Sequence, residues 1–313
     1  EETIMKFQLG YNPEKWDAFT KTALESGYKK EFLENSGLSI FKENKSFDRF
    51  RGRVIFPIHS LSGRVLGFGG RTLKADKKAA KYVNSPESEI YHKSKVLYGI
   101  YFAKSAISKE DQCYLVEGYT DVIGCHLAGI ERAVATCGTA LTPSHARLIG
   151  RFARRVVLAF DADGAGQAAA ERVYAWEEEF GLQFAVAALP EGADPGDLAG
   201  SDPEALRRAI DGARPFLEFR VDRVLARGDL DSAEGRARAA TEAMTLVAEH
   251  PDSLVRDQYA MSIADQCQVG IDELRRRGAA AVGCDPLKHA MQCPRCHAVT
   301  WPVGREEHPR RVP

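Results

Sequence analysis

Six carboxylates in three separate segments are the residues best suited to chemistry. Each segment follows a short apolar run, and the six are Glu117, Asp121, Asp161, Asp163, Asp194 and Asp197. Carboxylates that converge repel one another unless cations neutralise them. Oxygen ligation selects hard ions such as Mg²⁺ or Mn²⁺, and two such ions can activate a 3′-hydroxyl and stabilise a leaving pyrophosphate. We therefore expect all six to be metal ligands, and Glu117, Asp161 and Asp163 to be catalytic.

One of the three acidic segments has a simpler interpretation, as a helix cap. Asp161 and Asp163 stand in FDADGAG, and such a turn can do no more than cap a helix. The ordered presence of EGYTD before it and ADPGD after it favours the metal site. Gly164 and Gly166 would also let a phosphate approach the N-terminus of the following helix.

The elements that would position these acids alternate between strand and helix. Apolar runs predict strands at 114–118, 132–138, 154–160 and 183–190. Helices are predicted at 119–129, from Thr142-Pro143 onward, and at 165–181. This alternation predicts an α/β fold, a parallel sheet covered by helices on both faces. The acids would then gather beyond the carboxyl ends of the strands, where open sheets bind ligands.

The flanking regions have different patterns. Residues 13–36 predict two short helices, 49–73 a β-hairpin that turns at 59–63, and 74–95 a polar loop. Residues 203–278 carry amphipathic helical stretches, and 279–313 are rich in proline, arginine and histidine. We predict an α+β lobe over 1–110, a catalytic α/β domain over 111–200, a helical bundle over 201–278 and a loose tail over 279–313.

Charge separates these regions. Residues 1–110 hold 20 Lys+Arg and 13 Asp+Glu, a surplus of +7, and the remainder holds 23 against 31, a deficit of −8. A basic lobe beside an acidic one suits a protein that binds phosphates with one part and metal ions with the other. Arg49, Arg51 and Arg53 alternate along an expected strand and should share one face for an anion. Uneven residue usage and a charge-protected edge strand are the alternatives.

A compositional seam crosses the chain. Fifteen of the 16 lysines precede residue 110, whereas 22 of the 27 arginines follow it. The change suggests that two sequences of different composition join near residues 120–130. One hypothesis is therefore a chimeric or degenerate protein.

The motifs resemble a known family. VEGYTDV and FDADGAG resemble the toprim domain of bacterial DNA primases, and RFRGRVIFPI, GRVLGFGGRTL, KYVNSPES and IYHKSKVLYG are similar to the same family. The resemblance, over about residues 8–278, implies a nucleotidyltransferase, a DNA-directed RNA polymerase that makes short RNA primers on single-stranded DNA from NTPs during replication. It also implies that basic-lobe residues bind nucleic acid or nucleotide; with the alternating arginines these are Arg49, Arg51, Arg53, Arg71, Lys81, Asn84 and Lys93.

The sequence departs from that family in several places. The family's zinc-binding and helicase-docking domains are not recognisable, so we expect a core alone, with no docking of the replicative helicase. The start lacks an initiator Met, which suggests part of a longer chain. Cys293, Cys296 and His297, with Cys284, have metal-ligand spacing but no second pair, so zinc is not expected. Asp194 and Asp197 stand three residues apart, where many family members have acids two apart.

Other features exclude whole classes of protein. No apolar run reaches the roughly 18 residues of a membrane span, and no secretory signal is present. Seven scattered cysteines suggest reduced thiols and a cytoplasmic protein. Two alternatives stay open beside primer synthesis: a toprim nuclease or topoisomerase, the latter needing a tyrosine nucleophile on a separate domain, and a degenerate core that binds DNA without polymerising.

Overall fold

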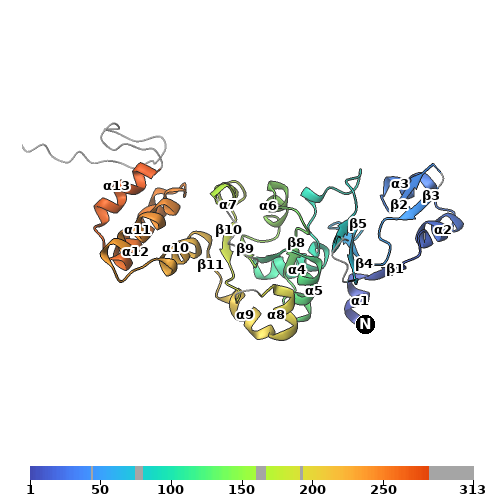
Figure 1. Cartoon of the computed structure of the whole chain (residues 1–313), viewed down its shortest axis with the longest axis horizontal. Coiled ribbons are helices and arrows are strands. Elements are labelled where there is room, and N and C mark those ends of the chain that lie inside the picture. Colours follow the sequence, from blue (N-terminus) through green and yellow to red (C-terminus); the bar gives the residue numbers. More distant parts are fainter. Residues whose placement is uncertain (44, 75–79, 160–166, 191–192, 282–313) are drawn as a thin grey trace, which may run out of the picture. The chain divides into compact units, whose positions relative to one another are not determined.

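The computed structural model describes residues 1–43, 45–74, 80–159, 167–190 and 193–281 (Figure 1). The chain forms two compact units. Unit 1 comprises Glu1–Gly164 and Trp176–Ala213, and unit 2 comprises Ala165–Ala175 and Arg214–Pro313. None of the described helices has the length and apolar character needed to span a bilayer.

The N-terminal part of unit 1 contains an antiparallel sheet in the order β1-β4-β5-β6. Its strands are β1 (Gly10–Asn12), β4 (Arg53–His59), β5 (Val65–Thr72) and β6 (Tyr82–Asn84), and α1 (Glu2–Phe7) precedes them. β4 and β5 pair antiparallel, which confirms the predicted hairpin. Gly63 in its turn has φ +87°, a conformation that favours glycine.

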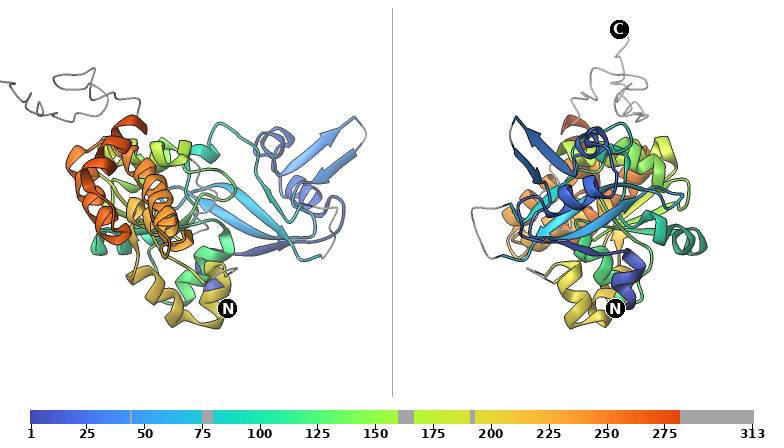
Figure 2. Two further views of the ribbon diagram at one scale, coloured as in Figure 1. Left: turned by 60° about the vertical axis from the view of Figure 1, so that its left-hand side comes forward. Right: turned by 90° about the vertical axis from the view of Figure 1, so that its right-hand side faces the viewer.

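A small helical layer lies beside a second hairpin (Figure 2). The helices are α2 (Ala18–Glu25) and α3 (Lys30–Asn35), and the hairpin is β2 (Ser39–Lys42) with β3 (Lys45–Asp48). The buried Asp48 carboxylate accepts hydrogen bonds from Phe19 N at 2.8 Å and Thr20 N at 2.9 Å. The first turn of α2 is thus capped by a carboxylate 28 residues later in the chain, which explains why the helix begins at Ala18 and not beside Pro13.

The second part of unit 1 is the predicted α/β domain. Its strands β7 (Gln112–Val116), β8 (Ala133–Ala135), β9 (Arg155–Leu158) and β10 (Gln183–Val186) are parallel, in the order β10-β9-β7-β8. Helix α6 (Pro143–Ile149) lies on one side of this sheet, and α5 (Tyr119–Leu127) and α8 (Pro195–Ser201) lie on the other (Figure 1). Thr142 caps α6 by accepting from His145 N at 3.2 Å, as its sequence predicts. The remaining elements are η1 (Lys93–Lys95), α4 (Ile100–Glu110) and α9 (Pro203–Asp211); helix α7 (Gln167–Phe180) belongs to unit 1 from Trp176 onward and to unit 2 before it.

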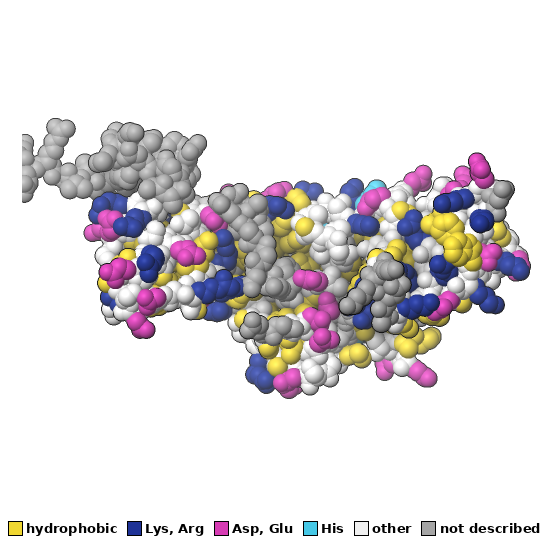
Figure 3. All heavy atoms as spheres, viewed as in Figure 1, with side chains coloured by type: hydrophobic (Ala, Val, Ile, Leu, Met, Phe, Trp, Pro, Cys, Tyr) yellow, Lys and Arg dark blue, Asp and Glu magenta, His cyan; other side chains and the backbone are white. Residues whose placement is uncertain are grey.

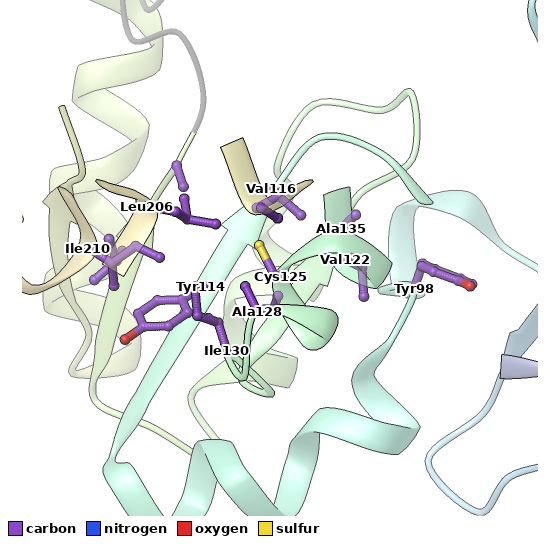
Figure 4. Close-up of a cluster of buried hydrophobic side chains, with 14 of the residues drawn as sticks. Tyr98, Tyr114, Val116, Val122, Cys125, Ala128, Ile130, Ala135, Leu206 and Ile210 are labelled. Carbon is purple, nitrogen blue, oxygen red and sulfur yellow. The ribbon is translucent and has the colours of Figure 1, made fainter. Parts of the chain in front are cut away.

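The core of unit 1 is continuous across the compositional seam. Its buried apolar cluster joins Phe56 and Tyr98 of the N-terminal part to Val122 and Cys125 of α5, and to Leu206 of α9. Figure 4 shows part of this cluster between α5 and the sheet. The backbones of Tyr98 and Ala135 also exchange two hydrogen bonds, of 2.8 and 3.0 Å. Residues from both compositional backgrounds therefore pack into one core.

Unit 2 is helical, as the amphipathic pattern predicts. It contains the short segment β11 (Arg214–Pro215) and helices α10 (Phe216–Arg227), α11 (Ala233–Ala248), α12 (Ser253–Cys267) and α13 (Ile271–Ala281). Ser232 and Asp252 cap α11 and α12 with their side chains. Arg220 of α10 and Glu249 form a nearly buried ion pair of 2.6 Å, which ties the first two helices together. Helix α9, inside the segment predicted as a bundle, belongs to unit 1.

Candidate active site

The first acids of the site stand where β7 gives way to α5. Glu117 follows β7 directly and is exposed, whereas Asp121 lies in the first turn of α5 and is only 8% exposed. One oxygen of Asp121, Oδ2, accepts from Gly118 N at 2.9 Å and so completes a capping box. The strand end and the helix start thus present two carboxylates four residues apart.

Two glycines allow α8 to bring a third carboxylate to Asp121. A Cβ on Gly124 of α5 would lie 3.1 Å from the Cα of Gly196 in α8, and a Cβ on Gly196 would lie 2.8 Å from Asp121 Oδ1 and 3.3 Å from Asp194 Oδ1. Such distances leave no room for larger residues. Asp194 is the N-cap of α8, where it accepts from Asp197 N at 2.6 Å. The helix approach therefore places Asp194 beside Asp121.

The electrostatics of this arrangement favour a bound cation. Burial raises the pKa of Asp121, and the nearby charges of Asp194 and Glu117 raise it further. The hydrogen bonds from Gly118 and Thr120 lower this pKa but do not offset the rise. Neutralising any of these carboxylates would relieve the repulsion. Figure 3 shows acidic side chains gathered where α5 and α8 meet.

The ligand set is only partly within the described residues. Asp161 and Asp163 lie outside them, as do Cys284, Cys293, Cys296 and His297. Within the described ranges, no three His, Cys, Asp or Glu residues are arranged as a complete metal site. The Glu117 carboxylate and Asp121 Oδ1 are oxygen donors suited to a hard cation, so the donor chemistry of these residues fits Mg²⁺ or Mn²⁺.

A group of basic residues at the N-terminal sheet is linked to this acidic site through Tyr82. Arg71 of β5 and Lys81 both lie against the ring of Tyr82 in β6, at 5.7 and 6.0 Å from its centroid. The Tyr82 hydroxyl is 3.3 Å from Thr120 Oγ1, and Thr120 precedes Asp121. We call Arg71, Lys81 and Tyr82 the Tyr82 strip. It gathers two cations around Tyr82, whose hydroxyl contacts the start of α5.

The prediction that Arg49, Arg51 and Arg53 share one strand face is wrong. Residues 49–52 form a turn, Gly52 has φ +65°, and β4 begins only at Arg53. A turn with a left-handed glycine breaks the alternation on which the prediction depends.

The three arginines accordingly have different surroundings. Arg49 Nε donates to the Gly37 carbonyl at 2.8 Å, and the Arg51 guanidinium lies 4.2 Å from the Trp16 ring centroid. Arg53 is buried and donates to three backbone carbonyls at 2.9–3.3 Å: those of Gly70, Ala80 and Lys81. Arg53 thus ties the end of β5 to the start of β6, while Arg51 stays stacked at the surface of Trp16.

Asn84 and Lys93 are held by the protein in different ways. Asn84 Nδ2 donates to the Cys137 carbonyl at 2.9 Å, and its Oδ1 accepts from the Tyr119 hydroxyl at 2.8 Å. Lys93 begins η1, where its backbone N donates to Glu87 at 3.0 Å. Its carbonyl accepts from His145 Nε2 of α6, also at 3.0 Å.

Sequence reasoning did not identify several residues that build the site. Gly124 and Gly196 set the helix contact, Tyr119 and His145 hold neighbouring segments, and Tyr82 links the basic strip to α5. The glycines within two short helices were the available signal, because glycine in a helix is unfavourable unless close packing requires it.

Family models and solved structures match most of this chain. A family model of the N-terminal domain of the DNA primase catalytic core matches residues 1–104, and a toprim-like model matches 114–199. A crystal structure of the RNA polymerase domain of Mycobacterium tuberculosis primase DnaG, in complex with DNA, is 39% identical, with a TM-score of 0.77; the match covers 86% of this chain and 87% of that one. The chain belongs to the DNA primase family. The toprim-type α/β fold predicted from the motifs is confirmed.

Other relatives have the same name. A Streptomyces coelicolor DNA primase is 40% identical over 264 residues, which is 82% of this chain and 41% of the relative. The Escherichia coli primase catalytic core is 34% identical, with a TM-score of 0.67 and coverage of 86% and 87%. The chain thus spans about two fifths of the length of the curated relatives that it matches.

One expectation about the partner is overturned. A family model described as the DnaB-helicase binding domain of primase matches residues 217–272, which include nearly all of α10, all of α11 and α12, and the start of α13. The expectation that no helicase-docking segment is present is therefore wrong. Helical periodicity predicts the bundle but carries no information about its partner, which explains the error.

Proposed function

We propose that this chain is a DNA-directed RNA polymerase core, a nucleotidyltransferase that makes short RNA primers on single-stranded DNA from NTPs during replication. The observation that carries the proposal is the meeting of the buried Asp121 with Asp194, Glu117 and the Tyr82 strip. An acidic site linked through Tyr82 to two cations suits a reaction that joins polyanionic substrates.

The acids would hold Mg²⁺ or Mn²⁺. We assign Glu117, Asp121, Asp194 and Asp197 to this role among the described residues, together with Asp161 and Asp163. When bound, the metal ions would lower the pKa of the primer 3′-hydroxyl and stabilise the leaving pyrophosphate. We do not expect zinc in this part of the protein.

The basic residues would hold the template, the RNA primer and the NTPs through their phosphates. Arg71 and Lys81 are the strongest candidates, because each belongs to the Tyr82 strip beside α5. Arg49, Arg51 and Lys93 are further candidates. Arg53 is the weakest, because its guanidinium is buried against backbone carbonyls. A relative described as a DnaG primase catalytic domain bound to ssDNA is 33% identical to this chain, which supports a single-stranded template here.

We further propose that residues 1–110, 111–200 and 201–278 act as basic lobe, catalytic domain and helical bundle. The family-model bounds of 1–104, 114–199 and 217–272 support this division. The bundle would contact the replicative helicase. The four described cysteines are free thiols, in keeping with a protein of the reducing cytoplasm.

Primer synthesis on single-stranded DNA with labelled NTPs and Mg²⁺ or Mn²⁺ tests the proposal. We expect short RNA products that disappear when EDTA is added. DNA binding without any product would favour the degenerate core, and DNA cleavage would favour a toprim nuclease. For the helicase, co-sedimentation of the purified chain with DnaB should be lost when α10–α12 are replaced by an unrelated helical bundle.

A further inference from the structure

Asn84 stands between the two parts of unit 1. It ends β6 of the N-terminal sheet, and its side chain contacts two segments of the α/β domain, α5 and the turn after β8. The carbonyl of Cys137 can only accept a hydrogen bond, so the amide nitrogen of Asn84 must face it. The amide oxygen is then free to accept from the Tyr119 hydroxyl. We call these two hydrogen bonds the Asn84 bridge.

One end of the bridge contacts the start of α5. Tyr119 is the first residue of that helix and is 2% exposed. Its ring packs against those of Phe56 and Tyr98, with centroids 5.0 and 4.7 Å away. Gly69, the partner of Asn84 in the β5–β6 ladder, leaves room for this ring, because a Cβ there would lie 2.3 Å from Tyr119 Cζ. Tyr119 is thus fixed at its ring and at its hydroxyl, two residues from Asp121.

The other end of the bridge is linked to the backbone of Glu117 through Cys137. Cys137 has φ +51°, a left-handed conformation that residues other than glycine rarely adopt. Its carbonyl accepts from Asn84, and its backbone N donates to the Glu117 carbonyl at 3.1 Å. The turn after β8 therefore transmits the position of Asn84 to the loop that presents Glu117.

We propose that Asn84 is a positioning residue that sets Glu117 and Asp121 relative to the Tyr82 strip, and is not itself a ligand of nucleic acid. Tyr82 lies two residues before Asn84 on the same strand, so β6 carries both the central residue of the Tyr82 strip and the bridge. The inference rests on the proposed function, because it concerns how that function's acids are placed.

The test compares Asn84→Ala, Tyr119→Phe and the double variant with the wild type. Tyr119→Phe is the sharper probe, since it removes one hydroxyl and keeps the buried ring. Asn35→Ala is the matched control, because Asn35 is an exposed asparagine at the end of α3. We would measure Mn²⁺ affinity by electron paramagnetic resonance and binding of a labelled single-stranded oligonucleotide at several salt concentrations. Hydrogen exchange of segments 116–121 and 136–139 would be followed without metal.

We expect Mn²⁺ affinity to fall about tenfold in Asn84→Ala and about fivefold in Tyr119→Phe, the losses that follow when a half-buried hydrogen bond is left unmade. The double variant should lose no more than Asn84→Ala, because both changes break one bridge. Exchange of both segments should accelerate in Asn84→Ala. Oligonucleotide affinity and its salt slope should stay as in the wild type and in Asn35→Ala.

The opposite pattern overturns the inference. If Asn84→Ala weakens oligonucleotide binding, reduces its salt slope by about 0.7 and leaves Mn²⁺ affinity unchanged, Asn84 contacts phosphate directly. Unchanged exchange in both segments overturns it equally. A wild type that binds no Mn²⁺ would defeat the proposed metal site, yet the exchange measurement would still decide the role of Asn84.

Discussion

Gly196 offers the most direct test of how the acidic site is assembled. In Gly196→Ala the new methyl group would lie 2.8 Å from Asp121 Oδ1 and 3.4 Å from Asp121 Cα. No real Cβ tolerates the first distance, so α8 must retreat from α5 or the Asp121 carboxylate must turn away. Asp121 cannot turn freely, because its other oxygen caps α5 at Gly118. Either response separates Asp121 from Asp194.

The size of the effect follows from two opposing terms. Overpacking of a close contact costs about 1–3 kcal/mol. Replacing glycine by alanine in a helix contributes up to about 1 kcal/mol in the other direction. The net expectation is a loss of about 0–2 kcal/mol in the free energy of unfolding of unit 1. Gly200 in the same helix has no atom within 4 Å of its Cβ position, so Gly200→Ala should stabilise by about 0.5–1 kcal/mol.

The assay compares the two variants side by side. Primer synthesis and Mn²⁺ affinity should fall at least roughly tenfold in Gly196→Ala, since a misplacement near 1 Å at a catalytic site can cost ~100-fold in rate. Both should stay at the wild-type level in Gly200→Ala. Thermal unfolding followed by circular dichroism gives the stabilities. If Gly196→Ala is as active and as stable as Gly200→Ala, the glycine contact does not place the carboxylates.

Four further outcomes are expected. Asp161→Ala should abolish primer synthesis and leave the circular dichroism spectrum unchanged; near-normal primer yield would remove it from the metal site. Arg71→Ala and Lys81→Ala should each weaken single-strand binding and reduce the slope of log affinity against log salt by about 0.7; unchanged slopes would mean no phosphate contact. Because the pKa of Asp121 is raised, its ionised form costs stability above that pKa and the cost disappears as pH falls through it. Asp121→Asn should therefore raise the melting temperature at neutral pH and abolish stabilisation by Mg²⁺, and a lowered melting temperature would contradict the reasoning. Glu249→Ala should destabilise unit 2 by about 3 kcal/mol in urea unfolding, because it leaves Arg220 nearly buried without its carboxylate; a loss under about 1 kcal/mol would show that water replaces the partner.

Local patterns were sufficient for most elements of the α/β domain. Apolar runs and the Thr142-Pro143 start predicted β7 to β10, α5 and α6 within a few residues, because these signals act over one or two turns of chain. Helices α1, α4 and α8 were not predicted. Helix α8 has a local start signal, Asp194 as N-cap and Pro195 after it, but its two glycines obscured the helix, and the first of them, Gly196, is accounted for only by its packing on α5.

The prediction for Arg49, Arg51 and Arg53 failed for a related reason. Alternation predicts a common face only where the backbone stays extended, and Gly52 turns it. The start of α2 shows the same limit, since its cap is Asp48, a residue distant in sequence. Long-range partners decide such features, and no window of neighbouring residues contains them.

The sequence by itself determined the family, the order of the acidic motifs and the strand–helix alternation that brings acids to one sheet edge. These follow from residue types and short spacings, which do not depend on distant contacts. Only the tertiary structure decided which carboxylates meet. Asp121 and Asp194 are 73 residues apart and become neighbours because two glycines let α5 and α8 approach. The Tyr82 strip and the Asn84 bridge join the two parts of unit 1 in the same way, because packing and burial act between residues that are close in space, whatever their separation in the chain.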